Sequence, residues 1–210
     1  MSHAKEAELQ RQVLDSEPWR HTLEMLRTST QVGFKNILFA TDFSSTTNLA
    51  LPYAVEIARR SGGTIHAVHV ISPDIYPLVP PEQWPKMAQE EKEFRGRKQE
   101  ELEQELQGLP HEFIFPEGNV WESLARIIEQ KNIDLLVMGT HGRTGIEKTI
   151  LGSVAETIFR QATCPVLTVG PRVSSRATHA AAAELNCILY ATNFSPPSLA
   201  AARYAIYLAK

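Results

Sequence analysis

The feature of this 210-residue sequence that most constrains the fold is a regular alternation of short apolar runs with longer amphipathic segments. The apolar runs have the length and composition of buried strands, and the longer segments repeat apolar residues at helical spacing. Strands are expected at residues 36–44, 64–71, 111–115, 134–140 and 164–170. Because a helix lies between each pair of successive strands, the sequence predicts an α/β fold in which right-handed crossovers build a parallel sheet.

The segments between the expected strands carry the end signals of helices. The first helix should begin at the capping residues 44–47 and end at the glycine pair 62–63. Pro52 falls inside it, so this helix either begins nearer Asn48 or bends at the proline. The prolines between residues 73 and 85 are expected to keep that loop free of helix and strand. Further helices are expected at residues 87–106, 120–130 and 153–161, the second of them capped by Asn119.

A loop bounded by glycines, GTHGRTGIEKTILGS, joins the fourth expected strand to the next helix. Gly139 and Gly142 leave no side chain where backbone N–H groups would approach an anion. Gly152 and Ser153 open a helix whose N-terminal amides and dipole favour negative charge. The loop therefore predicts a phosphate site. The structural alternatives are that Gly152 is only a turn and Ser153 only a helix cap.

Asp42 directly follows the first expected strand, and its position predicts a second part of the same site. Ligands of doubly wound parallel sheets bind at the carboxyl ends of the strands, where the strand order reverses. Asp42 and the glycine loop should therefore share one crevice, although they are far apart in the sequence. A single carboxylate fits ribose or magnesium binding better than acid–base catalysis. The structural alternative is that Asp42 caps the following helix.

The pattern Gly139-x-x-Gly142, nine residues, Gly152-Ser153 resembles the G-2x-G-9x-G-[S/T] signature of ATP-binding members of the universal stress protein family. The resemblance covers about residues 34–171 and includes the segments DLLVMGTHGRTG and ATCPVLTV. It implies a Rossmann-like, doubly wound five-stranded parallel sheet of the adenine nucleotide alpha-hydrolase type. The implied strand order is 3-2-1-4-5, with helices on both faces of the sheet.

The resemblance also implies which residues bind ATP. In the family, the positions of Ala40, Thr41 and Asp42 contact the base and the ribose, and the position of Val70 meets adenine through its backbone. Asp42 is also a candidate to hold Mg²⁺ through the nucleotide. The positions implied at the ribose and the phosphates are Met138, Gly139, His141, Gly142, Gly152, Ser153 and Val154.

The sequence lacks the motifs of several reaction classes. It contains no G-x-x-x-x-G-K-[S/T], G-x-G-x-x-G, G-x-S-x-G or H-E-x-x-H pattern, and no general base is evident. We therefore expect an ATP-binding regulator with slow hydrolysis at most and no catalytic residues. The alternatives are an interaction module of the same fold without nucleotide, and a weak ATPase. His66 and His69 are expected to be packing or surface residues, whereas Arg143 and Lys148 either neutralise phosphate or are simply solvated.

Composition limits the partners and the location of the protein. The formal net charge is −3, so no basic excess favours nucleic acid. The N-terminal segment is charged throughout, and no apolar run reaches the roughly 18 residues of a membrane-spanning helix. We therefore expect a cytoplasmic protein with no membrane or nucleic-acid partner. Cys164 and Cys187 lie outside any metal-ligand spacing and are expected to be buried thiols.

The C-terminal residues repeat the first strand and helix at an offset of 151, which pairs Ile37 with Ile188 and Phe43 with Phe194. Asn193 stands where the first copy has Asp42, and no glycine loop follows, so no second nucleotide site is expected. This half-repeat must pack on the first domain, pair with another chain or remain poorly ordered. The expected domains are an N-terminal helical extension (1–33), a universal stress protein domain (34–171), a linker (172–184) and an incomplete second domain of one strand and one helix (185–210).

The fifth expected strand, PVLTV, is apolar and should lie at a sheet edge. An edge strand presents unpaired N–H and C=O groups that invite another strand. We therefore expect a homodimer through this strand, a pairing that the family resemblance also implies. The strand expected in the half-repeat is a competitor for the same edge.

Overall fold

The structure is a computed structural model, which describes residues 32–72, 80–140, 153–170, 185 and 187–209. The chain divides into two compact units. One comprises residues 34–183, and the other comprises residues 1–33 together with 184–210. Among the described residues, no helix combines the length and the apolar character that crossing a membrane requires.

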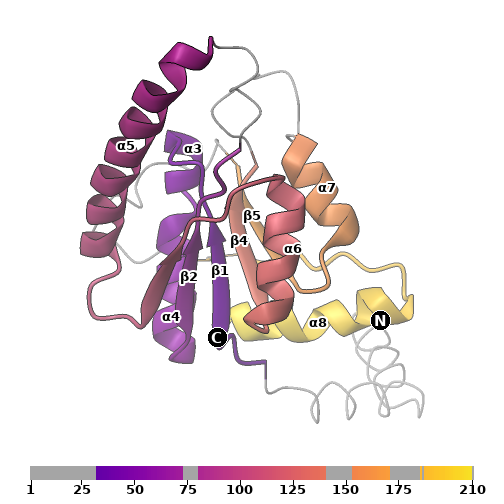
Figure 1. Ribbon diagram of the computed structural model, residues 1–210. Helices are drawn as coiled ribbons and strands as arrows, with labels where there is room; N and C mark the ends of the chain where they lie inside the picture. Colours follow the sequence, from indigo (N-terminus) through magenta and orange to yellow (C-terminus); the bar gives the residue numbers. More distant parts are fainter. Residues whose placement is uncertain (1–31, 73–79, 141–152, 171–184, 186, 210) are drawn as a thin grey trace, which may run out of the picture. The chain divides into compact units, whose positions relative to one another are not determined.

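The larger unit is built on a five-stranded sheet of order β3-β2-β1-β4-β5 (Figure 1). All four strand pairs are parallel. The expected strand order and the alternation of strands with helices are therefore confirmed. The strands are β1 (Asn36–Ala40), β2 (Thr64–Val68), β3 (His111–Ile114), β4 (Leu135–Gly139) and β5 (Val166–Val169).

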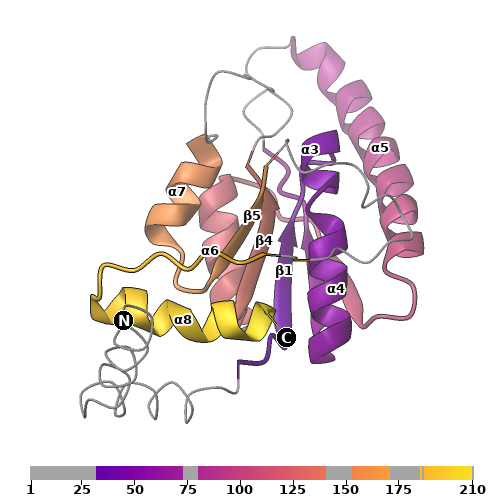
Figure 2. The ribbon, with the colours of Figure 1, turned by 180° about the vertical axis from the view of Figure 1, so that it is seen from behind.

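Helices cover both faces of this sheet, as expected for a doubly wound fold. Helix α6 crosses in front of the sheet in Figure 1, whereas α4 lies in front in Figure 2, which shows the opposite side. Right-handed crossovers explain the division, because the chain moves from β1 towards β3 on one face and from β3 towards β5 on the other. The helices of this unit are α3 (Ser45–Asn48), α4 (Leu51–Ser61), α5 (Trp84–Glu105), α6 (Val120–Gln130) and α7 (Ser153–Gln161), with a 3₁₀ turn, η2 (Pro81–Gln83).

The main hydrophobic cluster lies between the central strands and the helices α6 and α7. Leu38 and Leu136 of β1 and β4 are fully buried there with Leu124 of α6 and Ile158 of α7. Burying a side chain of this size contributes about 1.5–3 kcal/mol. The Asn119 side chain caps α6 as expected, because its oxygen accepts a hydrogen bond from the Glu122 N–H. This packing fixes β1 beside β4.

The segment after β1 forms two helices where one was expected. Pro52 is the second residue of α4, where a missing N–H costs no helical hydrogen bond. The chain therefore breaks between α3 and α4, which settles the open question about Pro52. At the other end, Gly62 adopts a left-handed φ of 60° as the C-cap. A Cβ on Gly63 would lie 2.3 Å from the Phe34 carbonyl oxygen, so this position also requires glycine.

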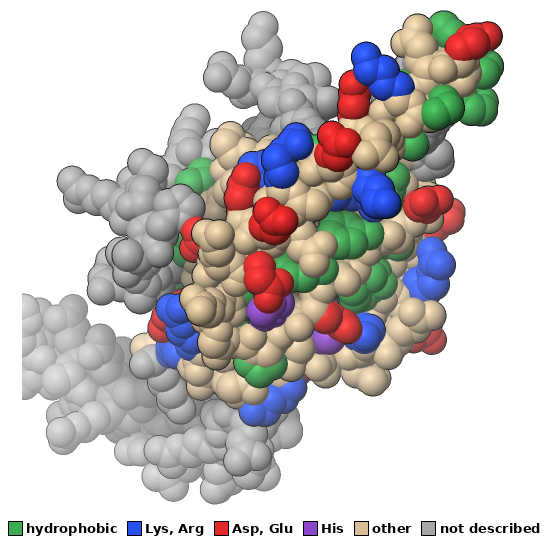
Figure 3. Space-filling view, turned by 60° about the vertical axis from the view of Figure 1, so that its left-hand side comes forward, with side chains coloured by type: hydrophobic (Ala, Val, Ile, Leu, Met, Phe, Trp, Pro, Cys, Tyr) green, Lys and Arg blue, Asp and Glu red, His purple; other side chains and the backbone are tan. Residues whose placement is uncertain are grey.

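The proline-rich loop is partly helical, which corrects the expectation that its prolines exclude helix. Pro81 begins η2, and Pro85 is the second residue of α5, so both occupy first-turn positions that proline tolerates. Helix α5 therefore starts before the expected residue 87. Its exposed side carries interspersed acidic and basic side chains (Figure 3), among them the Lys98–Glu101 pair at 2.6 Å. A solvated helix face is the expected reading of such a mixture.

In the smaller unit the structure describes helix α8 (Pro196–Leu208), which the repeat predicted. Residues 187–192 are all described and form no strand, which corrects the prediction of one strand there. A strand needs a hydrogen-bonded neighbour, and Leu189 is 92% exposed where its counterpart Leu38 is fully buried. The expectation of buried cysteines was wrong for Cys187, which is exposed. Cys164 is half-buried, and burial raises the pKa of its thiol.

Candidate functional site

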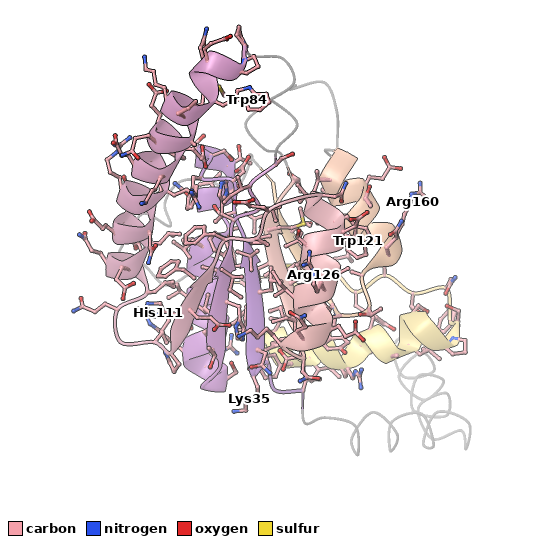
Figure 4. All side chains as sticks on the ribbon, viewed as in Figure 1. Lys35, Trp84, His111, Trp121, Arg126 and Arg160 are labelled. Atoms are coloured by element: carbon pink, nitrogen blue, oxygen red, sulfur yellow. The ribbon has the colours of Figure 1, made fainter. Side chains whose placement is uncertain are left out.

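The sheet has its topological switch point between β1 and β4, the two strands whose following crossovers leave in opposite directions. Ala40 at the end of β1 is paired in register with Met138 of β4. The carboxyl ends of these strands therefore lie side by side, as the sequence predicted for the segments carrying Asp42 and Gly139. Figure 4 orients this edge: Trp84, at the start of α5, lies towards the carboxyl ends of the strands, and Lys35 marks the opposite end.

A tight turn follows β1 and holds Asp42 in a fixed orientation. The Thr41 hydroxyl accepts a hydrogen bond of 2.9 Å from the Phe43 N–H. Asp42 Oδ1 accepts one of 3.0 Å from the Ser44 N–H and another of 2.6 Å from the Thr47 hydroxyl. These hydrogen bonds attach the Asp42 side chain to the start of α3. Asp42 is half-buried. The capping alternative was wrong, because Ser44 is the N-cap of α3 and its hydroxyl oxygen accepts the Thr47 N–H. Asp42 instead leaves a carboxylate at the carboxyl end of β1.

Phe43 completes the turn with a φ of 61°, a left-handed conformation that is unfavourable for a bulky residue. Its side chain is buried between two rings. The His69 ring centroid lies 4.5 Å away, and the Phe94 ring of α5 lies 5.8 Å away in an edge-on arrangement. Strained backbone held by its surroundings often occurs at ligand sites. Two kinds of contact therefore stabilise the conformation of the turn: the hydrogen bonds within it and the aromatic packing around Phe43.

Gly139 lies against the backbone of α3. A Cβ at this position would be 3.1 Å from the Thr47 Cα and 3.3 Å from the Thr46 carbonyl oxygen, both of which are backbone atoms. The sequence interpretation linked Gly139 to an approaching anion, whereas the structure gives it a second role in the close packing of α3 on β4. The turn carrying Asp42 can reach the end of β4 because residue 139 has no side chain.

The remaining predicted site residues differ in their surroundings. Ala40 and Val70 are half-buried, and Val70 lies just beyond β2. Thr41 and Met138 are buried, and the Met138 side chain joins the core beneath α6 and α7. Val154, in the first turn of α7, is 41% exposed. Ser153 begins α7, but its side chain lies outside the described residues, as do His141, Gly142 and Gly152 entirely.

The cationic side chains that could neutralise a phosphate fall in different places. Arg143 and Lys148 lie outside the described residues. Arg160 of α7 points away from the sheet (Figure 4) and donates a 2.9 Å hydrogen bond to Glu156. Within the described residues, no group of three or more His, Cys, Asp or Glu side chains could hold a metal ion. The described residues of the candidate site thus include the Asp42 carboxylate and the backbone at the ends of β1 and β4, whereas most of the glycine loop lies outside the described residues.

His66 of β2 and His69, which directly follows β2, both make contacts that the sequence did not predict. His69 is buried, and its Nδ1 lies 2.9 Å from the carbonyl oxygen of Thr41, a predicted site residue. His66 is also buried, and its Nδ1 lies 2.5 Å from Glu112 Oε1. The hydrogen bond from Lys131 lowers the Glu112 pKa, with His66 contributing. His66 contacts Glu112 of β3, whereas His69 contacts the predicted site residue Thr41.

An open parallel sheet with helices on both faces and a switch point between β1 and β4 defines a doubly wound α/β domain. The profile described as the universal stress protein family matches residues 33–170. The chain belongs to this family.

Individual relatives agree with this assignment. Universal stress protein MJ0531 of Methanocaldococcus jannaschii is 34% identical over 142 residues, which cover 65% of this chain and 82% of the relative. Universal stress protein A homolog 1 of Coxiella burnetii is 32% identical over 143 residues, covering 65% and 96%. The solved structure of MJ0577, also from M. jannaschii, has a TM-score of 0.63 and 29% identity, and covers 68% of this chain and 100% of its own.

Proposed function

We propose that this member of the family is a regulatory protein that binds ATP between the turn after β1 and the glycine loop after β4, and hydrolyses it slowly or not at all. The ligand class follows from chemistry that differs along the site. The β1 end offers a carboxylate and backbone groups, which suit ribose and base. The glycine loop and the N-terminus of α7 offer N–H groups and a positive dipole end, which suit phosphates.

The observation that carries this proposal is the adjacency of Asp42 and Gly139 at the switch point. Asp42 accepts two hydrogen bonds, and α3 packs closely on Gly139. The carboxyl ends of β1 and β4 are therefore held rigidly side by side. A ligand bound at these strand ends would contact the Asp42 carboxylate on one side and the start of the glycine loop on the other. In the proposed complex, Ala40, Thr41, Asp42 and Val70 contact the nucleoside, and Asp42 also holds Mg²⁺ when it accompanies ATP.

The phosphate half of the proposed complex consists of residues of β4, the loop and α7. Backbone amides supply most of its contacts, which is why glycines suit it. Among the described residues at this edge, Asp42 is the carboxylate placed to act on a ligand, and its Oδ1 is already engaged. This favours binding over acid–base chemistry. The proposed residues are Met138, Gly139, His141, Gly142, Gly152, Ser153 and Val154.

Two measurements test the proposal. The purified protein is denatured, and any released nucleotide is identified by chromatography. The nucleotide-stripped protein is then titrated calorimetrically with ATP, with and without Mg²⁺, using GTP as a matched control. Saturable ATP binding at one site with weaker GTP binding is the expected result. No released nucleotide and no heat of binding would contradict the proposal.

A second function, an interaction module without nucleotide, is favoured by one observation. Gly139 allows the close packing of α3, and Asp42 accepts hydrogen bonds from Ser44 and Thr47, so neither residue needs a ligand to explain its place. The calorimetric titration distinguishes the two functions, because a module of this kind would not bind ATP. A weak ATPase would bind ATP and also release phosphate over hours, which a phosphate assay detects.

We also propose a homodimer joined through β5 and a cytoplasmic location. Strand β5 is the last strand of the sheet order, and residues Val166–Thr168 of it are only half-buried. Edge strands of this kind pair readily with a second copy.

A further inference from the structure

His69 lies between the candidate site and helix α5. Its ring is 6% exposed, and its Nδ1 lies 2.9 Å from the Thr41 carbonyl oxygen. A carbonyl oxygen can only accept, so Nδ1 carries the hydrogen and donates it. On the other side of the ring, Nε2 lies 3.6 Å from Glu91 Oε1 of α5, an ion pair when the ring is doubly protonated. The ring also packs on Phe43 at 4.5 Å.

The half-repeat shows what the turn does without such a histidine. The Phe194 N–H donates a 2.9 Å hydrogen bond to the Thr192 hydroxyl, and the Ser195 N–H donates one of 3.0 Å to Asn193 Oδ1. Phe194 has a φ of 61°, the value found at Phe43. The same turn therefore forms from local hydrogen bonds, although Phe194 is 65% exposed and Phe43 only 9%.

This comparison distinguishes the conformation of the turn from the contacts that attach the turn to the rest of the domain. The local sequence alone produces the shape, because both copies have it. In the first copy the Thr41 N–H also donates to the Val68 carbonyl and the Thr47 hydroxyl donates to Asp42 Oδ1. His69 adds the bond to the Thr41 carbonyl and the ring packing on Phe43. These two contacts hold the peptide between Thr41 and Asp42 from its carbonyl side, so they contribute to the direction in which the turn presents the Asp42 carboxylate.

We infer that His69 is a positioning residue of the ligand site: it orients the Thr41–Asp42 peptide through its Nδ1–H and its ring packing on Phe43. The inference rests on the proposed function for its effect on ATP affinity, but the effect on the turn itself is independent of any ligand.

Three substitutions of His69 in the full chain test this positioning role. They differ in whether a side-chain N–H donor remains and in which ring nitrogen it replaces. In His69→Asn the side-chain NH₂ takes the place of Nδ1, whereas in His69→Gln it takes the place of Nε2. His69→Leu removes both polar atoms. ATP affinity is measured by calorimetry. Hydrogen–deuterium exchange is followed at the amides of Phe43 and Ser44, with Phe194 and Ser195 as an internal control of equal local bonding.

We expect His69→Gln and His69→Leu to weaken ATP binding about tenfold, the effect of losing roughly one hydrogen bond, and His69→Asn to stay within about threefold of wild type. Exchange at Phe43 and Ser44 should rise in the two weak variants, with Phe194 and Ser195 unchanged. Equal exchange in all proteins would overturn the inference. So would equal loss in the Asn and Gln variants, because ring packing would then be the sole contribution. If wild-type protein binds no ATP, the proposed function fails, and the exchange measurement still decides the role of His69.

Discussion

Replacing Gly139 by alanine tests whether the close packing of α3 on β4 is a real constraint. The added methyl would lie 3.1 Å from the Thr47 Cα and 3.2 Å from its N. Both atoms belong to backbone, so no side-chain rotation can relieve the contact. Overpacking of this kind costs about 1–3 kcal/mol. For a protein of this size, that lowers Tm by about 2–12 °C.

The measurement is urea denaturation of Gly139→Ala beside two control substitutions. A Cβ on Gly170 would meet its nearest neighbour, the Thr140 Oγ1, at 3.7 Å, an ordinary contact. Gly96, inside α5, has nothing within 4 Å, so alanine there should stabilise the helix by up to about 1 kcal/mol. The reasoning is refuted if Gly139→Ala changes the free energy of unfolding by less than about 0.5 kcal/mol, the range of an unconstrained surface position.

Three further predictions concern the loop, an ion pair and the half-repeat. Gly142→Val places a branched side chain where phosphate is proposed to bind, and calorimetry should show weaker ATP binding; unchanged affinity would contradict the site. Lys131→Met should destabilise the fold by less than about 1 kcal/mol at neutral pH, as for a partly exposed pair. Because Lys131 lowers the Glu112 pKa from 4.5, the difference from wild type in urea denaturation should shrink as the pH falls below that value, and a constant difference would refute the pairing. Deleting residues 176–210 should leave ATP affinity unchanged while changing stability or the dimer seen by light scattering; a monomeric full-length protein at every concentration would exclude the dimer.

The strands were predictable because they depend on patterns that neighbouring residues carry together, whereas their order followed from the family resemblance. Continuous apolar runs such as Leu135–Met138 occur where both faces of a strand are covered, and β4 is buried throughout. The cap at Asn119 was predictable for a similar reason, since capping is a local interaction. The place of Asp42 beside the end of β4 followed from the topology of parallel sheets, without any knowledge of side-chain contacts.

Features that depend on distant contacts could not be predicted. Nothing near Gly139 in the sequence reveals that the α3 backbone approaches it, because α3 precedes it by about ninety residues. His69 was expected to be an ordinary packing or surface residue, because its partners, the carbonyl of Thr41 just after β1 and a carboxylate on α5, are distant in the sequence. The prolines misled for a different reason: proline breaks a helix interior but suits its first turn, and the position of that turn was unknown.

The two copies of the Ala-Thr-[Asp/Asn]-Phe-Ser segment show which part of the candidate site depends only on neighbouring residues in the sequence and which part depends on distant contacts. Both form the same turn, with a left-handed phenylalanine that costs about 1–2 kcal/mol and two side-chain-to-backbone hydrogen bonds that offset the cost. The helix that follows is less local: α8 is continuous where Arg203 replaces Pro52, whereas the first copy breaks into α3 and α4. The strand before the turn is least local, since β1 pairs with two neighbours and residues 187–192 form no strand. A ligand site needs all three levels, because the turn supplies the carboxylate, the break brings α3 against Gly139, and the neighbouring strands supply His69 and the glycine loop. Changing Asn193 to aspartate would therefore complete the motif of the second copy without creating a second site.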